Sequence, residues 1–194
     1  PDANYNGSDS FDFTVSDGSE SSTESVTLTV SAVNDAPVLA SVSDVSFDED
    51  GSGSTSLSGS DVDGDALTYN ITGGSDITAS LSGSDVSFSA PANYNGSESF
   101  TVSVTDGTET DSQSITVTVN AVNDAPVAAT GLFGTADEDG SVVVTLTGSD
   151  VDGDNLSFSV GSAANGSLSL SGSLVTYTPD ANYNGSDSFD FTVS

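Results

Sequence analysis

The residues best suited to chemistry in this chain are three aspartates at alternate positions in the segment Gly-Ser-Asp-Val-Asp-Gly-Asp, which spans 59–65 and recurs unchanged at 148–154. Each copy follows the residues Asn-Asp-Ala-Pro, at 34–37 and 123–126. Clustered carboxylates repel one another unless a cation lies among them, and the chain has no Lys, Arg or His to provide one. Carboxylate, amide and carbonyl oxygens are the ligands of hard cations, so the sequence predicts Ca²⁺ sites here.

The composition excludes several classes of function. The 30 acidic residues and the absence of basic ones give a formal charge of −30 over 194 residues. The 9 Phe and 5 Tyr in alternating runs indicate that the chain is nevertheless folded. A folded chain of this charge is expected to be neutralised by bound cations. Without His, Cys, Lys or Arg there is no imidazole base, thiol nucleophile or Schiff base, and phosphate contacts to nucleic acid are excluded. A carboxylate pair could make a glycosidase, but a repeated acidic set without an aromatic platform argues against an enzyme. No apolar run is long enough to span a membrane.

The chain repeats with a period of 89 residues. Asp-Glu-Asp-Gly occurs at 48 and 137, and Ala-Asn-Tyr-Asn-Gly-Ser occurs at 3, 92 and 181. Residues 1–16 and 179–194 are identical. This period predicts three parts: the C-terminal part of one repeat (1–35), a complete repeat (36–124) and the N-terminal part of the next (125–194).

Apolar residues alternate with Ser and Thr along the complete repeat, as in half-buried strands. Six alternating runs and a short one near 77–81 predict seven strands, and no stretch shows a helical period. We therefore expect an all-β fold of tandem seven-stranded Greek-key immunoglobulin-like (cadherin-like) sandwiches. Tyr5, Tyr94 and Tyr183 precede the sixth strand, where a tyrosine corner is expected.

This topology predicts two groups of oxygen ligands at opposite ends of the complete repeat. The loops after the second and sixth strands lie at the end where the chain enters, and those after the first and fifth lie where it leaves. The expected ligands at the entering end are Asn34, Asp35, Asp61, Asp63, Asp65 and Asp106. The expected ligands at the leaving end are Asp48, Glu49, Asp50, Asn95, Glu98, Asn123 and Asp124.

The neighbouring repeats carry matching acidic residues. The leaving end is expected to face Asp150, Asp152 and Asp154 of the next repeat, which gives more oxygens than the six to eight that one Ca²⁺ takes. The remaining candidate ligands are Asp17, Asp137, Glu138 and Asp139.

These motifs resemble the cadherin-like and bacterial immunoglobulin-like tandem repeats of large secreted adhesins, including the extender regions of RTX-type adhesins. The Asn-Asp-Ala-Pro linker is similar to the Asn-Asp-containing linker of cadherins. The cadherin Asp-x-Asp motif is matched by Asp61 with Asp63 and by Asp150 with Asp152. The acidic residue that follows the first strand of a cadherin repeat is matched by Glu49 and Glu138. The resemblance implies a rod of β-sandwiches whose linkers are rigidified by calcium, located outside the cell or on its surface.

Other interpretations of the motifs remain. Asp-x-Asp-Gly-Asp can be a simple turn, and an EF-hand fits poorly because the twelfth position from Asp61 is Thr72. The expected function is a spacer or fibre-forming segment of a bacterial adhesin or filament, acting in adhesion or matrix assembly. The alternative is a calcium-dependent module that binds carbohydrate or protein.

The expected partners are neighbouring repeats of the same chain, with lateral or head-to-tail self-association in a fibre as a further possibility. In one version, residues 1–35 complete the partial repeat of a second copy by donating a strand. The identity of 1–16 and 179–194 argues against a clean version, because both ends would supply the same sixth strand. A window of a long covalent array is the preferred interpretation.

Overall fold

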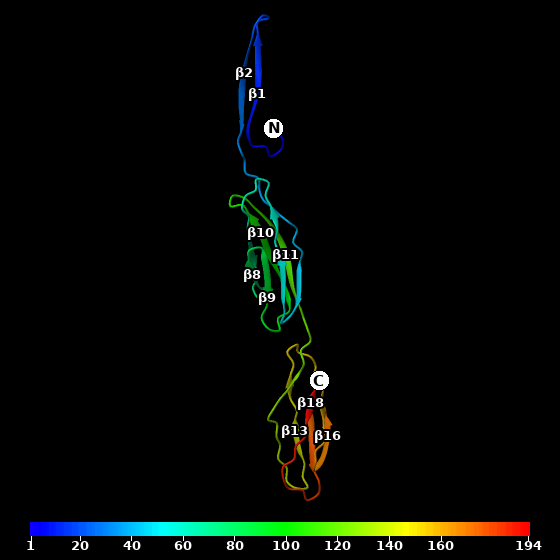
Figure 1. Cartoon of the computed structure of the whole chain (residues 1–194). Coiled ribbons are helices and arrows are strands. Elements are labelled where there is room, and N and C mark those ends of the chain that lie inside the picture. Colours follow the sequence, from blue (N-terminus) through cyan, green and yellow to red (C-terminus); the bar gives the residue numbers. More distant parts are fainter. The chain divides into compact units, whose positions relative to one another are not determined.

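The computed structural model describes all 194 residues and forms two compact units, Pro1–Ala121 and Val122–Ser194. Every regular element is a β-strand, which agrees with the alternating sequence pattern (Figure 1). No helix is present that has the length and apolar character needed to cross a membrane.

The first unit begins with a two-stranded hairpin. Strands β1 (Gly7–Ser16) and β2 (Ser21–Val30) are antiparallel over ten residue pairs, from Gly7 opposite Val30 to Ser16 opposite Ser21. Period-2 alternation places Phe11, Phe13 and Leu28 on one face of this hairpin. All three side chains are about half exposed, so this apolar face is uncovered.

The rest of the first unit is a β-sandwich. One sheet has the order β4-β11-β10-β7, in which β4 is parallel to β11 and the other pairs are antiparallel. Its strands are β4 (Val45–Asp48), β11 (Thr110–Asn120), β10 (Gly96–Thr105) and β7 (Thr68–Gly73). The facing sheet contains β5 (Ser52–Ser56), β9 (Asp85–Ser89) and β8 (Thr78–Ser82) in that order. The short strands β3 (Val38–Leu39) and β6 (Gly59–Ser60) pair with each other.

The seven predicted strands are all present in this sandwich. Two of them are divided: the first consists of β3 and β4, and the second consists of β5 and β6. The prediction of an immunoglobulin-like sandwich is confirmed. The order of the strands puts the loops 61–65 and 106–109 at one end of the sandwich, where β6 and β10 end.

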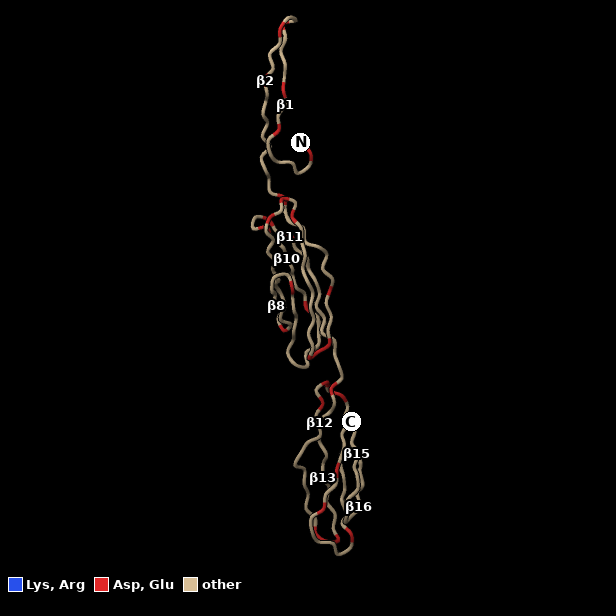
Figure 2. The backbone as a smooth tube through the Cα atoms, viewed as in Figure 1, with Lys and Arg blue, Asp and Glu red and all other residues tan.

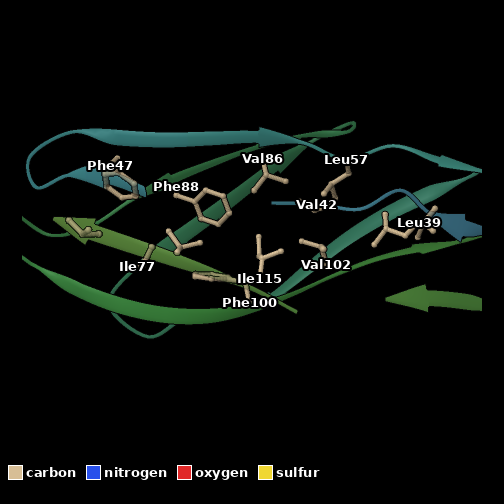
Figure 3. Close-up of a cluster of buried hydrophobic side chains, with 13 residues drawn as sticks. Leu39, Val42, Phe47, Leu57, Ile77, Val86, Phe88, Phe100, Val102 and Ile115 are labelled. Carbon is tan, nitrogen blue, oxygen red and sulfur yellow. The ribbon is translucent and has the colours of Figure 1, made fainter. Parts of the chain in front are cut away.

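The core of the sandwich is formed by the inward-facing residues of both sheets (Figure 3). Val102, Val104 and Val117 have no exposed surface. Phe88 from one sheet and Phe100 from the other meet edge to face, with ring centroids 5.3 Å apart at 69°. Burial of this alternating apolar set is the main force that holds the two sheets together.

The second unit has the same sequence of elements but lacks counterparts of two strands, β4 and β11. A three-stranded sheet has the order β13-β17-β16, and two pairs, β12-β14 and β15-β18, accompany it. Their bounds are β12 (Val127–Ala128), β13 (Val142–Thr145), β14 (Gly148–Ser149), β15 (Phe158–Val160), β16 (Gly166–Ser171), β17 (Leu174–Pro179) and β18 (Phe191–Val193). No strand of this unit takes the place that β11 has in the sandwich of the first unit.

Candidate metal site at the acidic loops

The acidic residues lie mainly in the loops that join the strands, and no Lys or Arg is present beside them (Figure 2). In the first unit, the loop after β6 is folded around the carboxylate of Asp61. Its Oδ1 accepts hydrogen bonds from the backbone N–H groups of Asp63 (2.8 Å), Gly64 (3.0 Å) and Asp65 (3.3 Å). Gly64 has a φ of +82°, which favours glycine and lets the loop reverse. As a result, carboxylate oxygens of Asp61, Asp63 and Asp65 lie within 4.8 Å of one another.

The linker before the sandwich contacts this loop and the neighbouring one. The backbone N–H of Asp35 donates to Oδ2 of Asp63 at 2.7 Å. The Asn34 side chain Nδ2 donates to Oδ2 of Asp106 at 2.9 Å and to Oε2 of Glu109 at 3.2 Å. These contacts join residues that are about 28 to 75 positions apart in sequence.

All six oxygen-bearing residues predicted for the entering end are therefore brought together in the structure. Sequence reasoning missed Glu109, which joins the set through Asn34. The signal was present: Glu109 is three residues after Asp106, and Oδ1 of Asp106 accepts its backbone N–H at 2.7 Å, in a turn that aligns the two residues.

The Asp106 carboxylate is stabilised in its charged form. Hydrogen bonds from the Glu109 backbone amide, the Asn34 side chain and the Thr108 backbone amide hold its pKa below the ordinary value. Asp17, at the equivalent position one repeat earlier, has its pKa lowered by the backbone amides of Glu20 and Ser19. Asp17 therefore occupies a turn of the same kind in the hairpin.

The donor set fits a hard cation. Asp61 is half-buried, and its Oδ2 is shielded from solvent without a hydrogen-bond partner. A buried carboxylate oxygen is costly when it has no partner, and no basic side chain exists to pair with it. The three loop aspartates supply carboxylate oxygens, which are the ligand type that Ca²⁺ prefers. A Ca²⁺ ion in this loop would use Asp61, Asp63 and Asp65 as ligands.

The second unit repeats this arrangement. The backbone N–H of Asp124 donates to Oδ2 of Asp152 at 2.6 Å, and that of Asp154 donates to Oδ1 of Asp150 at 3.2 Å. The side chain of Asn123 donates to the carbonyl of Asp124 at 2.9 Å. Carboxylate oxygens of the three loop aspartates again lie within 4.8 Å of one another, and Asn123, Asp124, Asp150 and Asp154 line a hollow of about 380 Å³.

The predicted ligands at the leaving end of the first sandwich have structural contacts of their own. Asp48 ends β4, and its Oδ1 accepts the side chain of Asn120 at 3.1 Å. Glu49 is 6% exposed, and its backbone N–H donates to the carbonyl of Asn120 at 2.9 Å. Asp50 is at φ +60°, and its Oδ1 accepts the backbone N–H of Asn93 at 3.1 Å. The expectation that this group faces Asp150, Asp152 and Asp154 stays a prediction.

Two predicted ligands are placed differently from this group. Glu98 accepts the backbone N–H groups of Ser75 (2.8 Å), Asp76 (3.1 Å) and Ile77 (3.1 Å), and the Ser75 hydroxyl at 2.5 Å. The Ser75 hydroxyl and the Asp76 amide are the main causes that lower the Glu98 pKa to about 2. Glu98 thus holds the turn before β8, and Asn95 is exposed in the loop before β10.

The corresponding acidic turn of the second unit is exposed. Asp139, at φ +59°, accepts the backbone N–H of Asn182 at 3.1 Å, as Asp50 does with Asn93. Asp137 accepts the backbone N–H of Gly140 through its carbonyl at 3.0 Å. Glu138 is exposed, whereas its equivalent Glu49 is buried beside β11.

The sequence matches the family model of the bacterial Ig domain over residues 1–31, 34–119 and 123–194. The chain belongs to this family. No curated protein matches the sequence.

Solved structures with a similar fold include cadherin repeats. The likeness to repeats EC1-3 of mouse protocadherin-24 has a TM-score of 0.51 at 14% identity, and covers 96% of this chain and 78% of that one. For domains 1–6 of surface layer protein SbsC, the TM-score is 0.41 at 18% identity. The alignment covers 91% of this chain and 25% of the SbsC chain. For an endo-fucoidan hydrolase of glycoside hydrolase family 107, the TM-score is 0.38 at 20% identity. The alignment covers 98% of this chain and 32% of the hydrolase. The likeness to the protocadherin-24 repeats shows a shared fold alone. The other two likenesses carry no argument about fold or catalysis.

Proposed function

We propose that this chain is a structural repeat whose acidic loops bind Ca²⁺ and thereby stiffen the joints of an extracellular rod. The observation that carries the proposal is the cluster of Asp61, Asp63 and Asp65, whose carboxylate oxygens lie within 4.8 Å of one another in a chain without a basic side chain. The cluster recurs in the second unit, directly after a linker of the same sequence.

The mechanism is electrostatic. Without a cation, the carboxylates of the loop repel one another and also repel Asp106, which the linker contacts through Asn34. A bound Ca²⁺ replaces this repulsion with ligand bonds from both the loop and the region of the linker. The linker then loses its freedom to move relative to the sandwich that follows it. A ligand concentration of 100 times the dissociation constant adds roughly 2.7 kcal/mol of stability for each site.

The family and the composition support a proposal for the cellular role. Bacterial Ig domains are generally found outside the cell or on its surface, and the chain offers no catalytic imidazole, thiol or amine. We propose a spacer or fibre-forming segment of a secreted bacterial adhesin or filament. A calcium-dependent module that binds carbohydrate or protein is not favoured, because the acidic loops of the two units are near copies without a distinct aromatic platform.

Isothermal titration calorimetry of the full chain with CaCl₂ tests the proposal. Saturable binding is expected with a dissociation constant on the order of 10⁻⁴ to 10⁻³ M, as in extracellular calcium modules. The double variant Asp61→Asn with Asp150→Asn removes the central carboxylate of each loop and should abolish most of the binding heat.

The matched control is Asp85→Asn, which removes one charge from β9, a strand that belongs to neither loop and in which Asp85 accepts the Ser56 hydroxyl. This variant should bind Ca²⁺ like the parent chain. Absence of saturable binding by the parent, or equal loss of binding in the control, would show that the acidic loops are ordinary turns.

A further inference from the structure

A continuous row of hydrogen bonds joins the first part of the complete sandwich to its last strand. Within the row, β4 and β11 are parallel over four residue pairs, from Val45 opposite Val117 to Asp48 opposite Asn120. The backbone N–H of Glu49 extends the row by donating to the carbonyl of Asn120 at 2.9 Å. The row therefore reaches the last residue of β11.

Side chains continue the row before β4 begins. There β3 pairs with β6 instead of with β11, so the chain crosses from one strand pair to another. Along this crossing segment, defined here as residues 39–44, side-chain contacts to β11 take the place of a backbone ladder. The backbone N–H of Leu39 donates to Oδ2 of Asp111 at 2.8 Å, that of Val42 donates to Oε1 of Gln113 at 3.1 Å, and that of Thr116 donates to Oδ1 of Asp44 at 2.7 Å.

Gln113 is the only glutamine of the chain, and it bonds the crossing segment twice. Besides accepting the Val42 N–H, its side chain donates through Nε2 to the carbonyl of Val42 at 2.5 Å. An amide carries both a donor and an acceptor, so it replaces the two bonds that a neighbouring strand would supply. Val42 is 7% exposed and its side chain lies in the core (Figure 3), so these bonds are partly screened from water and are strengthened by that screening.

The order of the contacts gives the row one mechanical direction. Residues 39–49 contact residues 111–120 in the same order, because the two segments run in parallel. The chain enters the sandwich before residue 39 and leaves it after residue 120, at the opposite end of the row. Tension between these two points therefore slides the segments past one another and loads all contacts together. Pulling both segments from the same end would instead break the contacts one at a time.

We propose that the complete sandwich bears tensile load, and that Asp44, Asp111 and Gln113 form a clamp that holds the crossing segment to β11 under this load. The clamp acts apart from the calcium proposal, because its hydrogen bonds join the crossing segment to β11. That tension occurs along the chain rests on the proposed role as a spacer, whereas the strength of the clamp is a property of the sandwich alone.

The clamp positions differ in type between the repeats. A phenylalanine offers no hydrogen-bonding group, and a carboxylate accepts hydrogen bonds but does not donate them. Sequences with such residues at the clamp positions should therefore hold the crossing segment less firmly. One period of 89 residues away, Asp44 corresponds to Phe133, Asp111 to Ser22 and Gln113 to Glu24.

Constant-force optical tweezers on the full chain in EDTA test the proposal, and handles can be attached at chosen sites because the chain has no cysteine. Handles on Val33→Cys and Ala121→Cys load the row in shear and leave the hairpin and the second unit outside the load path. Handles on Val33→Cys and Thr108→Cys pull both segments from the end where Asp111 holds Leu39, and so peel the row. All three attachment positions are exposed.

The parent chain should unfold about tenfold or more slowly in shear than in peeling at the same force, since several hydrogen bonds must break together. Unfolding in shear should release up to about 300 Å of chain, at roughly 3.3–3.6 Å per residue. This comparison of two pulling directions uses no clamp variant, so it does not depend on whether such a variant folds.

Gln113→Met removes both bonds of Gln113 and keeps a side chain of similar length. In shear it should unfold about tenfold faster than the parent at the same force, because two hydrogen bonds of the loaded row are lost. The matched control Glu98→Gln weakens the bonds to residues 75–77, which lie outside the row, and should unfold in shear like the parent. Urea unfolding of both variants separates a general loss of stability from loss of the clamp.

Equal unfolding rates of the parent in shear and in peeling would overturn the proposal, because the row would then bear no load. Equal acceleration by Gln113→Met and Glu98→Gln would overturn it as well, because the clamp would have no special part in resisting force. Since EDTA is present throughout, either failure would leave the calcium proposal untouched. Conversely, absence of calcium binding in the calorimetric titration would not change these unfolding rates.

Discussion

Replacement of Asp65 by Asn is expected to change the stability of the first unit in opposite directions with and without calcium. The Asp65 carboxylate accepts no hydrogen bond, so the isosteric amide removes charge and leaves the contacts of the loop in place. Its backbone N–H continues to donate to Asp61. The change therefore isolates the electrostatic role of one carboxylate in the cluster.

The magnitude follows from the separations in the loop. Two unit charges 4.8 Å apart repel by about 0.9 kcal/mol in a water-like medium, and Asp65 takes part in two such pairs, with Asp61 and Asp63. Screening at about 0.15 M ionic strength reduces the total to about 1 kcal/mol. In EDTA, Asp65→Asn should thus raise the unfolding temperature by roughly 4–8 °C for a domain of this size.

In excess CaCl₂ the same substitution should be destabilising, because a charged ligand has been removed from the ion. A tenfold weaker site corresponds to a loss of about 1.4 kcal/mol of binding free energy. Thermal unfolding followed by circular dichroism, in EDTA and in CaCl₂, measures both effects. Asp85→Asn is the control and should shift the unfolding temperature equally in both media. If Asp65→Asn also gave equal shifts in both media, no cation would bind among these carboxylates.

Three further predictions concern the fold. The pKa of Glu98 is lowered from 4.5 to about 2. The stability that its charged form contributes is therefore complete above about pH 4.5 and is lost as the pH falls towards 2. In urea unfolding, the stability of Glu98→Gln should depend less on pH over this window than that of the parent. Phe100→Ala should cost about 3–5 kcal/mol in urea unfolding, because it empties a position that is 1% exposed, and an equal loss on replacing half-exposed Phe11 by Ala would contradict this. Gly74→Ala should destabilise by more than about 1 kcal/mol, because φ is +75° and a Cβ would lie 2.4 Å from the Ile77 carbonyl oxygen, whereas Gly83→Ala, at φ +65° with open space around it, should cost less in the same assay.

The sequence was sufficient for the fold because its signals are local and repeated. Alternation at Phe100, Val102 and Val104 places all three in the core, and a single period identifies the same strand in every repeat. Two features were not foreseen: the division of the first two strands, and the absence of a strand at residues 134–137. Both depend on pairing between distant segments, such as Val45 with Val117.

The candidate site was predictable in its residue types and in its location at the entering end. The pairing of Asn34 with Asp106 follows from strand order, which the sequence pattern supplies. The role of Glu98 was not predictable, because its carboxylate holds a turn at 75–77 that only the folded β10 brings within reach. Glu109 was missed for a related reason: its part in the cluster depends on the linker side chain that it contacts.

Small-angle X-ray scattering of the full chain tests most directly our proposal that calcium rigidifies the joints between repeats. The scattering should be recorded on the monomer peak of a size-exclusion column, in excess CaCl₂ and again in EDTA. We expect a larger maximum dimension and a stiffer particle in calcium, and loss of both effects in the Asp61→Asn, Asp150→Asn chain. Identical scattering profiles in calcium and EDTA would show that calcium does not stiffen the joints.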